Sequence, residues 1–235
     1  MQLSKNEEKA YETLRGHNLF VFQIKDLCLL LNLARVDAYN LIKALKYKRV
    51  IKKQGAFYSF FDTDDFVIAV NIHFPSYISL WTALNYYGWS DQLPKKIYLC
   101  TTKYAPPLNH FSFITLSPKR FFGYTSLNGI VIAEKEKAII DSLFFPKYAG
   151  GIAEIDACLR KALPQLDKEK LITYALQMKS KAVLRRMGYL LEKLGVKEQI
   201  LKKIKRHIGH GYELLDPTLP RKNLNNLKWL LDVNI

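Results

Sequence analysis

The feature that most restricts the fold is the succession of patterns in the first sixty residues. Three short stretches have helical spacing, and two stretches with strand alternation follow them. Ser4 followed by Glu7 is a capping-box pattern, which predicts a first helix that ends near Gly16. Apolar residues recur with helical periodicity in "QIKDLCLLLN" and "ARVDAYNLIKALKYK", and this predicts a second and a third helix.

The stretch "RVIKKQGAFYSF" comes directly after the third predicted helix. Its alternation on both sides of Gln54-Gly55 predicts a strand, a tight turn at these two residues and a second strand. Three helices followed by a β-hairpin in such a short segment describe a winged helix-turn-helix. We therefore predict a domain of this kind over residues 1–61.

The third predicted helix has one face suited to a core and one suited to solvent. We expect its core face to hold Val36, Leu41, Ile42 and Leu45. In a winged helix-turn-helix this helix enters the major groove, where Asn can pair with adenine and Arg with guanine, while cations of the hairpin contact phosphates. The candidate DNA-binding residues are therefore Arg35, Tyr39, Asn40, Lys43, Lys46, Lys48, Arg49, Lys52 and Lys53. The alternative is a protein-interaction module whose lysines are merely solvated.

Charge is distributed unevenly along the chain, whose formal net charge is +15. Residues 1–61 hold 11 Lys and Arg against 5 Asp and Glu, and residues 151–235 hold 17 against 9. Residues 62–150 are nearly neutral, with 8 against 7. Basic ends around a neutral middle suggest a polyanion or an acidic protein as partner, although a solvated surface can also be basic.

The middle of the chain, residues 62–150, has the pattern of an α+β layer. A helix is expected to begin at Pro75-Ser76 and to end at Gly88. Strands are expected in "KIYLCTT", "FSFITL", "RFFGYT" and "GIVIA", and a further helix in "EKEKAIIDSLFF". The last part, residues 151–235, is expected to be mainly helical. The predicted fold class is therefore α+β, with a winged helix-turn-helix, an α+β middle layer and a mainly helical C-terminal part.

A second basic surface is predicted in this C-terminal part. In "KAVLRRMGYLLEKLG" the apolar residues follow a helical stripe, and we expect Arg185 and Arg186 to lie on the outer face. The next helix adds Lys202 and Lys203. These four residues are candidates for contact with nucleic acid or with an acidic protein face. A solvated helix surface explains the same pattern equally well.

Several residues invite a catalytic or metal-binding interpretation that the surrounding pattern does not favour. Asp62-x-Asp64 has the spacing of a carboxylate pair, but acidic residues that open the next helix are the simpler explanation. His207 and His210 lie at a helix end without a Cys or Glu ligand in register. Asp141 has no partner indicated by the sequence pattern, and we expect it to bond backbone or a basic side chain. With no phosphate-binding loop or nucleophile elbow either, we predict neither an enzyme nor a bound cofactor or metal.

The sequence also indicates the compartment. Its start, "MQLSKNEEKA", lacks the apolar region of a secretory signal, and no apolar run approaches the ~18 residues of a membrane span. Cys28, Cys100 and Cys158 are far apart and odd in number, which predicts reduced thiols rather than disulfides or a zinc site. We therefore expect a cytoplasmic protein that does not contact a membrane.

The order of segments resembles the AbiEi-type abortive-infection antitoxins, also described as predicted transcriptional regulators of viral defence. The resemblance extends over nearly the whole chain. It includes the winged helix over 1–61 and continues in "SYISLWTALNYYGWSDQLPKKIYLCTT", "GIVIAEKEKAIIDSL", "RRMGYLLEKLG" and "LLDP…KWLLDVN".

This resemblance implies the antitoxin role of a type IV toxin–antitoxin system. In that family the N-terminal winged helix binds inverted repeats in the promoter of its own operon. The C-terminal region supports this binding and counteracts a nucleotidyltransferase-like toxin without forming a stable complex with it. A stand-alone winged-helix transcriptional regulator without a toxin is the first alternative. An RNA-binding or nucleotidyl-transfer enzyme is the second.

Overall fold

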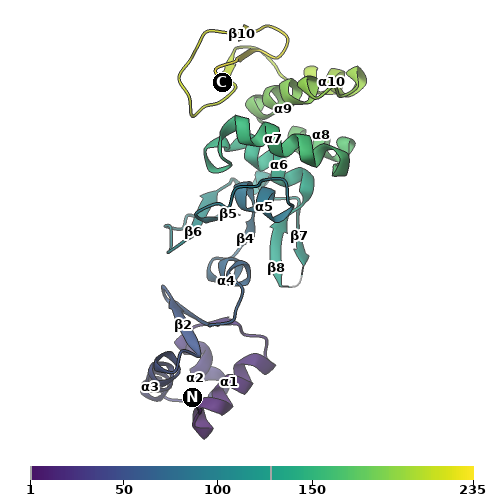
Figure 1. Cartoon of the computed structure of the whole chain (residues 1–235). Coiled ribbons are helices and arrows are strands. Elements are labelled where there is room, and N and C mark those ends of the chain that lie inside the picture. Colours follow the sequence, from purple (N-terminus) through teal and green to yellow (C-terminus); the bar gives the residue numbers. More distant parts are fainter. Residues whose placement is uncertain (1, 128) are drawn as a thin grey trace.

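The computed structural model describes residues 2–127 and 129–235 and has a mixed α+β fold, as predicted. The elements follow one another along a long axis, so the N-terminal helices and the C-terminal segment lie at opposite ends of the molecule (Figure 1). In the described part of the chain, no helix has both the length and the apolar character needed to cross a bilayer.

The first sixty residues form three helices and a small antiparallel sheet, as the pattern predicts. The helices are α1 (Lys5–Gly16), α2 (Ile24–Leu31) and α3 (Arg35–Tyr47), and the strands are β1 (Val21–Phe22), β2 (Ile51–Gln54) and β3 (Phe57–Phe60). Strand β3 lies between β1 and β2. At the start of α1, the Glu7 carboxylate accepts a hydrogen bond of 2.6 Å from the Ser4 backbone N–H, which is half of the predicted capping box.

The β2–β3 hairpin turns one residue later than predicted. Gln54 is still a strand residue, paired with Phe57, so the turn consists of Gly55 and Ala56. Gly55 has a φ of +61°, a left-handed conformation that glycine adopts without steric cost. The glycine therefore sits at the first turn position rather than the second.

A separate hydrophobic core holds this N-terminal part together. It includes Ala10, Leu14, Phe22, Leu27, Ala38, Ile42, Leu45, Ile51, Tyr58 and Phe60. Within α3, Ile42 and Leu45 face this core as predicted, but Val36 does not, because its side chain is 71% exposed. Ala38 takes the inward position instead, since the spacing of 38, 42 and 45 follows one helix face.

The middle of the chain forms a five-stranded mixed sheet in the order β6-β5-β4-β8-β7. Its strands are β4 (Ser76–Ile78), β5 (Ile97–Thr101), β6 (Phe111–Thr115), β7 (Tyr124–Leu127) and β8 (Ile130–Ala133). The prediction of a helix from Pro75-Ser76 was wrong at its start: residues 76–78 form the central strand, where Ile78 pairs with Leu99 and Ile132. A continuous apolar stretch that is buried on both faces fits a central strand as well as a helix.

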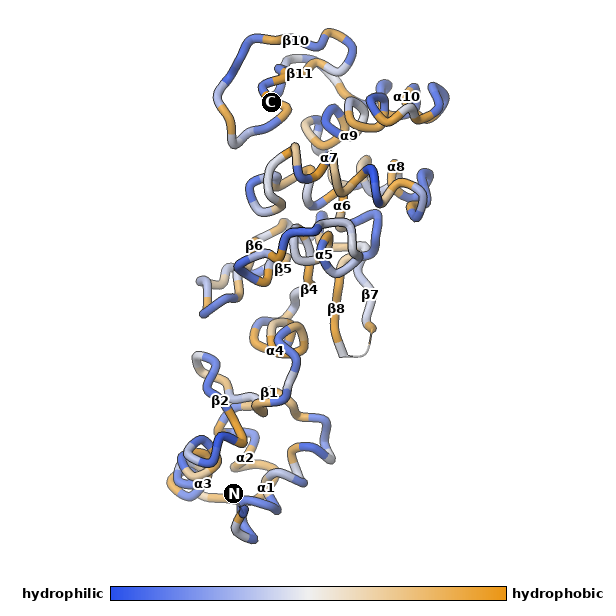
Figure 2. Tube along the Cα trace, viewed as in Figure 1, coloured by the Kyte–Doolittle hydropathy of each residue, from blue (hydrophilic) through white to orange (hydrophobic). Residues whose placement is uncertain are grey.

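Helices cover the sheet and build the far end of the molecule (Figures 1 and 2). They are α4 (Asp65–Ile72), α5 (Leu80–Tyr86), α6 (Lys135–Phe144), α7 (Gly151–Ala162), α8 (Lys168–Gln177), α9 (Lys181–Lys193) and α10 (Glu198–Lys205). Asp64 caps α4 by accepting from the Phe66 N–H at 2.7 Å, as expected for an acidic helix start. A terminal sheet of β9 (Glu213–Leu214), β10 (Asn225–Asn226) and β11 (Leu231–Asp232) closes over α9.

Candidate nucleic-acid interface

The exposed face of α3 carries cations and tyrosines at helical spacing. Arg35, Tyr39, Lys43 and Lys46 follow one another at intervals of four, four and three residues, which places them on the same side of the helix. All four are exposed. The buried Ala38, Ile42 and Leu45 hold the adjoining side of the helix against the core, and the cationic side is directed to solvent. We call the set Arg35, Tyr39, Lys43, Lys46 and Tyr47 the α3 face.

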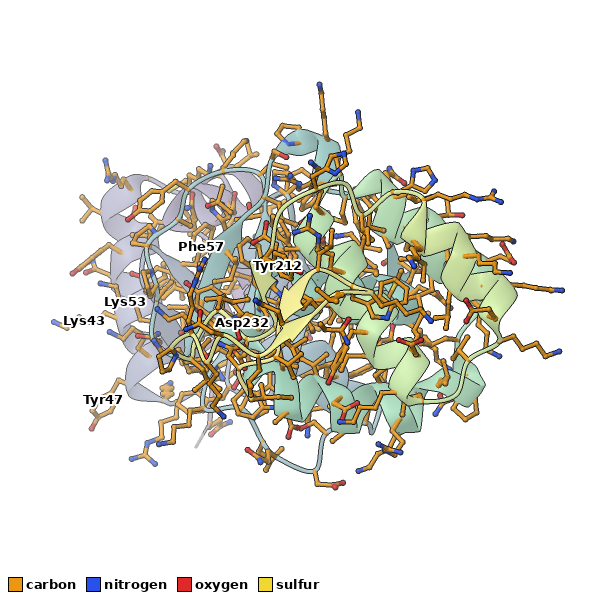
Figure 3. The ribbon with its side chains drawn as sticks, turned by 90° about the horizontal axis from the view of Figure 1, so that it is seen from above. Lys43, Tyr47, Lys53, Phe57, Tyr212 and Asp232 are labelled. Atoms are coloured by element: carbon orange, nitrogen blue, oxygen red, sulfur yellow. The ribbon has the colours of Figure 1, made fainter. Side chains whose placement is uncertain are left out.

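Tyr47 is a member of the α3 face that the sequence reasoning missed. Its side chain is 81% exposed, more than the 58% of Tyr39. Figure 3 shows Lys43, Tyr47 and Lys53 along the same side of the molecule, with Lys43 extending farthest. The signal was available, because Tyr47 lies four residues after Lys43 and eight after Tyr39.

The cations of the α3 face and the turn after it are not neutralised by the fold. Within residues 2–127 and 129–235, none of Arg35, Lys43, Lys46, Arg49 and Lys53 makes an ion pair. Asp37 is the one carboxylate on α3, in its first turn. Unpaired cations on a helix narrow enough for a major groove can exchange the counterions of DNA phosphates.

Lys48, also predicted as a DNA contact, differs from these exposed cations because its side chain is engaged within the fold. Its ammonium group donates to the Glu7 carboxylate at 2.5 Å and to the Gln2 carbonyl at 2.9 Å. The side chain is 19% exposed. Its hydrogen bond lowers the pKa of Glu7, and a further bond from the Ser4 backbone N–H acts in the same direction. Lys48 therefore ties the end of α3 to the start of α1.

Lys52 lies on the hairpin and contacts a residue of the body of the molecule. Its ammonium group lies 3.3 Å from a carboxylate oxygen of Asp65, whose other oxygen lies 3.1 Å from the His110 ring. Nearby, the Asn109 side-chain amide donates to the Gln54 side-chain oxygen at 2.7 Å. These contacts attach the hairpin to the body, so Lys53 is the freer of the two predicted hairpin lysines.

Asn40 lies on the side of α3 that is turned towards α1. It is exposed and lines a groove of about 420 Å³ together with residues of both helices, including Asn6, Asp37 and Leu41. Its amide is not hydrogen-bonded to any of the described residues. The side chain is therefore free to reach a base edge, from the flank of the α3 face.

The predicted second basic surface is wrong for both arginines. Arg185 is 1% exposed and Arg186 is 5% exposed, because the segment after α10 and the terminal sheet pack over α9. Trp229 approaches α9 so closely that a Cβ on Gly188 would lie 2.1 Å from its ring. The side of α9 that helical periodicity predicts to be exposed is therefore buried under the C-terminal segments of the chain.

Backbone carbonyls satisfy both buried guanidinium groups. Arg185 donates to the carbonyl of Ile208 at 2.9 Å and to that of His210 at 2.6 Å. Arg186 donates to the carbonyls of Leu143 and Leu215, each at 2.9 Å. Burial lowers the pKa of both arginines, yet an arginine so placed keeps its charge. These residues therefore hold α6, α9 and the C-terminal segment together.

The two lysines of the predicted surface are exposed as expected. Lys203 pairs with Glu169 at 2.7 Å, whereas Lys202 lies with Lys205 and Arg206 around a shallow hollow on α10. The basic surface of the C-terminal part therefore lies on α10 rather than on α9.

Asp141 is the centre of a fully buried polar cluster. Its carboxylate pairs with the Lys137 ammonium group and accepts hydrogen bonds from Tyr77 at 2.9 Å and Ser79 at 2.8 Å. Lys137, one helical turn earlier, is the partner that the sequence reasoning overlooked. Burial raises the pKa of the neighbouring Cys100 thiol well above its usual value, so this thiol is not a ready nucleophile. With Tyr77, Ser79, Lys137 and Asp141 all at zero exposure, the cluster functions as a polar core that joins α6 to the sheet.

Comparison with solved structures identifies a protein with a similar fold. The crystal structure of the RV2827C protein from Mycobacterium tuberculosis is similar over 98% of this chain and 92% of its own, with a TM-score of 0.70 and 12% sequence identity. Neither a protein-family model nor a curated protein matches the sequence. The structural likeness therefore covers the N-terminal helices, the sheet and the C-terminal helices together.

Proposed function

We propose that this chain is a DNA-binding antitoxin of a type IV toxin–antitoxin system that represses its own operon and counteracts a nucleotidyltransferase-like toxin. Residues 1–61 act as a winged helix-turn-helix, with α3 as the helix that enters the major groove and the β2–β3 hairpin as the wing. The DNA is the promoter of the operon, at inverted repeats.

The observation that carries DNA binding is the α3 face. It combines three cations that are unpaired among the described residues with two tyrosines, and all five side chains are exposed on α3. Arg35 is suited to a guanine edge, and Lys43 and Lys46 to phosphates. Lys53 and Arg49 extend the cationic surface towards the hairpin.

The antitoxin part of the proposal is supported by the resemblance of the ordered sequence segments to the AbiEi-type family. The stand-alone transcriptional regulator without a toxin remains the alternative, since the α3 face serves both equally. The neighbouring gene distinguishes them. A downstream nucleotidyltransferase-like gene whose toxicity is relieved by co-expression of this chain supports the antitoxin, and growth inhibition that this chain leaves unchanged refutes it.

Footprinting on the DNA upstream of its own gene tests the binding. We expect the full chain to protect inverted repeats and the R35E/K43E variant to lose this protection. The matched control is K95E/K96E, which makes the same charge change on two exposed residues just before β5. Protection that survives R35E/K43E would show that the α3 face does not hold the DNA.

A further inference from the structure

Most of the loop between β9 and β10 is exposed. Every residue of this segment, 217–224, which we call the cap loop, is open to solvent. Leu219 is 41% exposed and Leu224 is 59% exposed, while Leu227 just beyond the loop is 78% exposed. The apolar surface that these leucines leave open to solvent is available to a partner.

Buried polar groups hold the cap loop in one conformation. Asp232, 5% exposed, accepts hydrogen bonds from the backbone N–H groups of Asn223 at 3.1 Å and Leu224 at 3.2 Å. At the other end of the loop, Asp216 accepts from the backbone N–H of Thr218 at 2.8 Å. These two carboxylates are 3–5% exposed and point inward.

Asn234 completes the attachment. It is fully buried, and its side-chain amide donates to the carbonyls of Leu219 at 3.0 Å and Pro220 at 3.1 Å. The same amide donates to the Asp216 carbonyl at 2.7 Å. Three buried polar side chains thus position a loop whose own side chains add little to the core. A loop ordered in advance loses less conformational entropy when it binds a partner.

The chemistry of the cap loop indicates what that partner is. The loop carries Arg221 and Lys222, and residues 217–227 contain no Asp or Glu. Its flanking carboxylates, Asp216 and Asp232, are turned inward. Cations interspersed with leucines complement a surface that is both acidic and apolar, whereas single-stranded nucleic acid would call for aromatic side chains that stack on bases.

We propose that the cap loop is a docking surface for an acidic protein face that carries apolar side chains, such as an acidic amphipathic helix. The leucines contact the apolar side of the partner, and Arg221 and Lys222 lie beside its carboxylates. The cap loop and α3 are at opposite ends of the molecule (Figure 1), so a bound partner leaves α3 uncovered. The proposal therefore does not depend on DNA binding.

Nuclear magnetic resonance of the isotope-labelled full chain tests this docking. The probe is a synthetic amphipathic helix of about 18 residues made of leucine and glutamate, compared with a scrambled peptide of the same composition. We expect the helical peptide to shift backbone amide signals of residues 217–227. The R221E/K222E variant should bind it about tenfold more weakly, and L219S/L224S should also weaken it.

The control variant is K95E/K96E, which reverses two adjacent exposed charges just before β5 and should leave the affinity within about twofold. The proposal is overturned if the shifted signals map to α10 or to the α3 face. Equal binding of the scrambled peptide, or equal weakening by the two charge-reversed variants, would also overturn it. So would a short DNA duplex that shifts the same loop signals at lower concentration than the peptide.

Discussion

Helices α3 and α9 carry similar patterns in the sequence and have opposite environments in the structure. Each has an apolar stripe and basic residues off the stripe. On α3 the basic residues face solvent and make no ion pair with any described residue, whereas on α9 Arg185 and Arg186 are buried against backbone carbonyls. Helical periodicity identifies the face that packs on the nearest core, but it does not show whether a later segment covers the other face.

The largest expected effect is a difference in unfolding free energy between variants of Arg186, which is buried on α9, and of Arg35, which is exposed on α3. Replacing Arg186 with Ala leaves the carbonyls of Leu143 and Leu215 buried without a donor and should cost about 3–5 kcal/mol of unfolding free energy. The matched change R35A removes a solvated side chain and should stay within about 0.5 kcal/mol. Chemical denaturation of both variants measures this difference, and similar losses would mean that Arg35 is structural after all.

The buried cluster of α6 gives the next effect. K137M leaves the Asp141 charge without its cationic partner in a site closed to water, and we expect a loss of about 3 kcal/mol in unfolding free energy. The double variant K137M/D141L should cost clearly less than the sum of K137M and D141L, because the two groups stabilise each other. Additive losses in thermal or chemical unfolding would contradict the pairing.

A smaller effect is expected at Asn40. If its amide pairs with a base, N40A should weaken operator binding by about 1–3 kcal/mol and relax the preference at one base position. Selection of bound sequences from a randomised pool, performed with both proteins, measures that preference. An unchanged sequence preference would show that Asn40 lines the groove between α1 and α3 but does not read a base.

The smallest effect concerns the tie between Lys48 and Glu7. Because this contact lowers the pKa of Glu7 in the folded chain, its contribution is present above the ordinary value of 4.5 and is lost as the pH falls through the folded pKa. The melting temperature of the natural chain should therefore exceed that of E7Q at neutral pH and approach it in acid. A difference in melting temperature that stays constant from pH 7 to acid would contradict the role of the Glu7 carboxylate.

Local patterns predicted much of the fold. The Ser4 and Glu7 pattern, the spacing of Ile42 and Leu45, and the alternation around Gly55 each depend on residues close in sequence, and each element formed near its expected bounds. The prediction that a helix starts at Pro75-Ser76 was wrong because these residues lead into strand β4. This strand pairs with β5 and β8, which lie far along the chain.

The candidate site was predictable to a similar extent and for the same reason. Exposure of Arg35, Lys43 and Lys46 follows from which side of α3 is apolar. The engagement of Lys48 with Glu7 and of Lys52 with Asp65 depends on how separate elements meet, which periodicity does not encode. The same holds for the Asp141 cluster, where only Lys137 is near in sequence.

The salt dependence of DNA binding tests most directly the claim that the α3 face neutralises phosphates. The slope of log K against log salt should decrease in magnitude by up to about 2 when Lys43 and Lys46 are both replaced with Ala. The control K95A/K96A, which removes two exposed charges just before β5, should keep the slope of the natural chain. A slope that K43A/K46A leaves unchanged, or one that both variants reduce equally, would contradict the account.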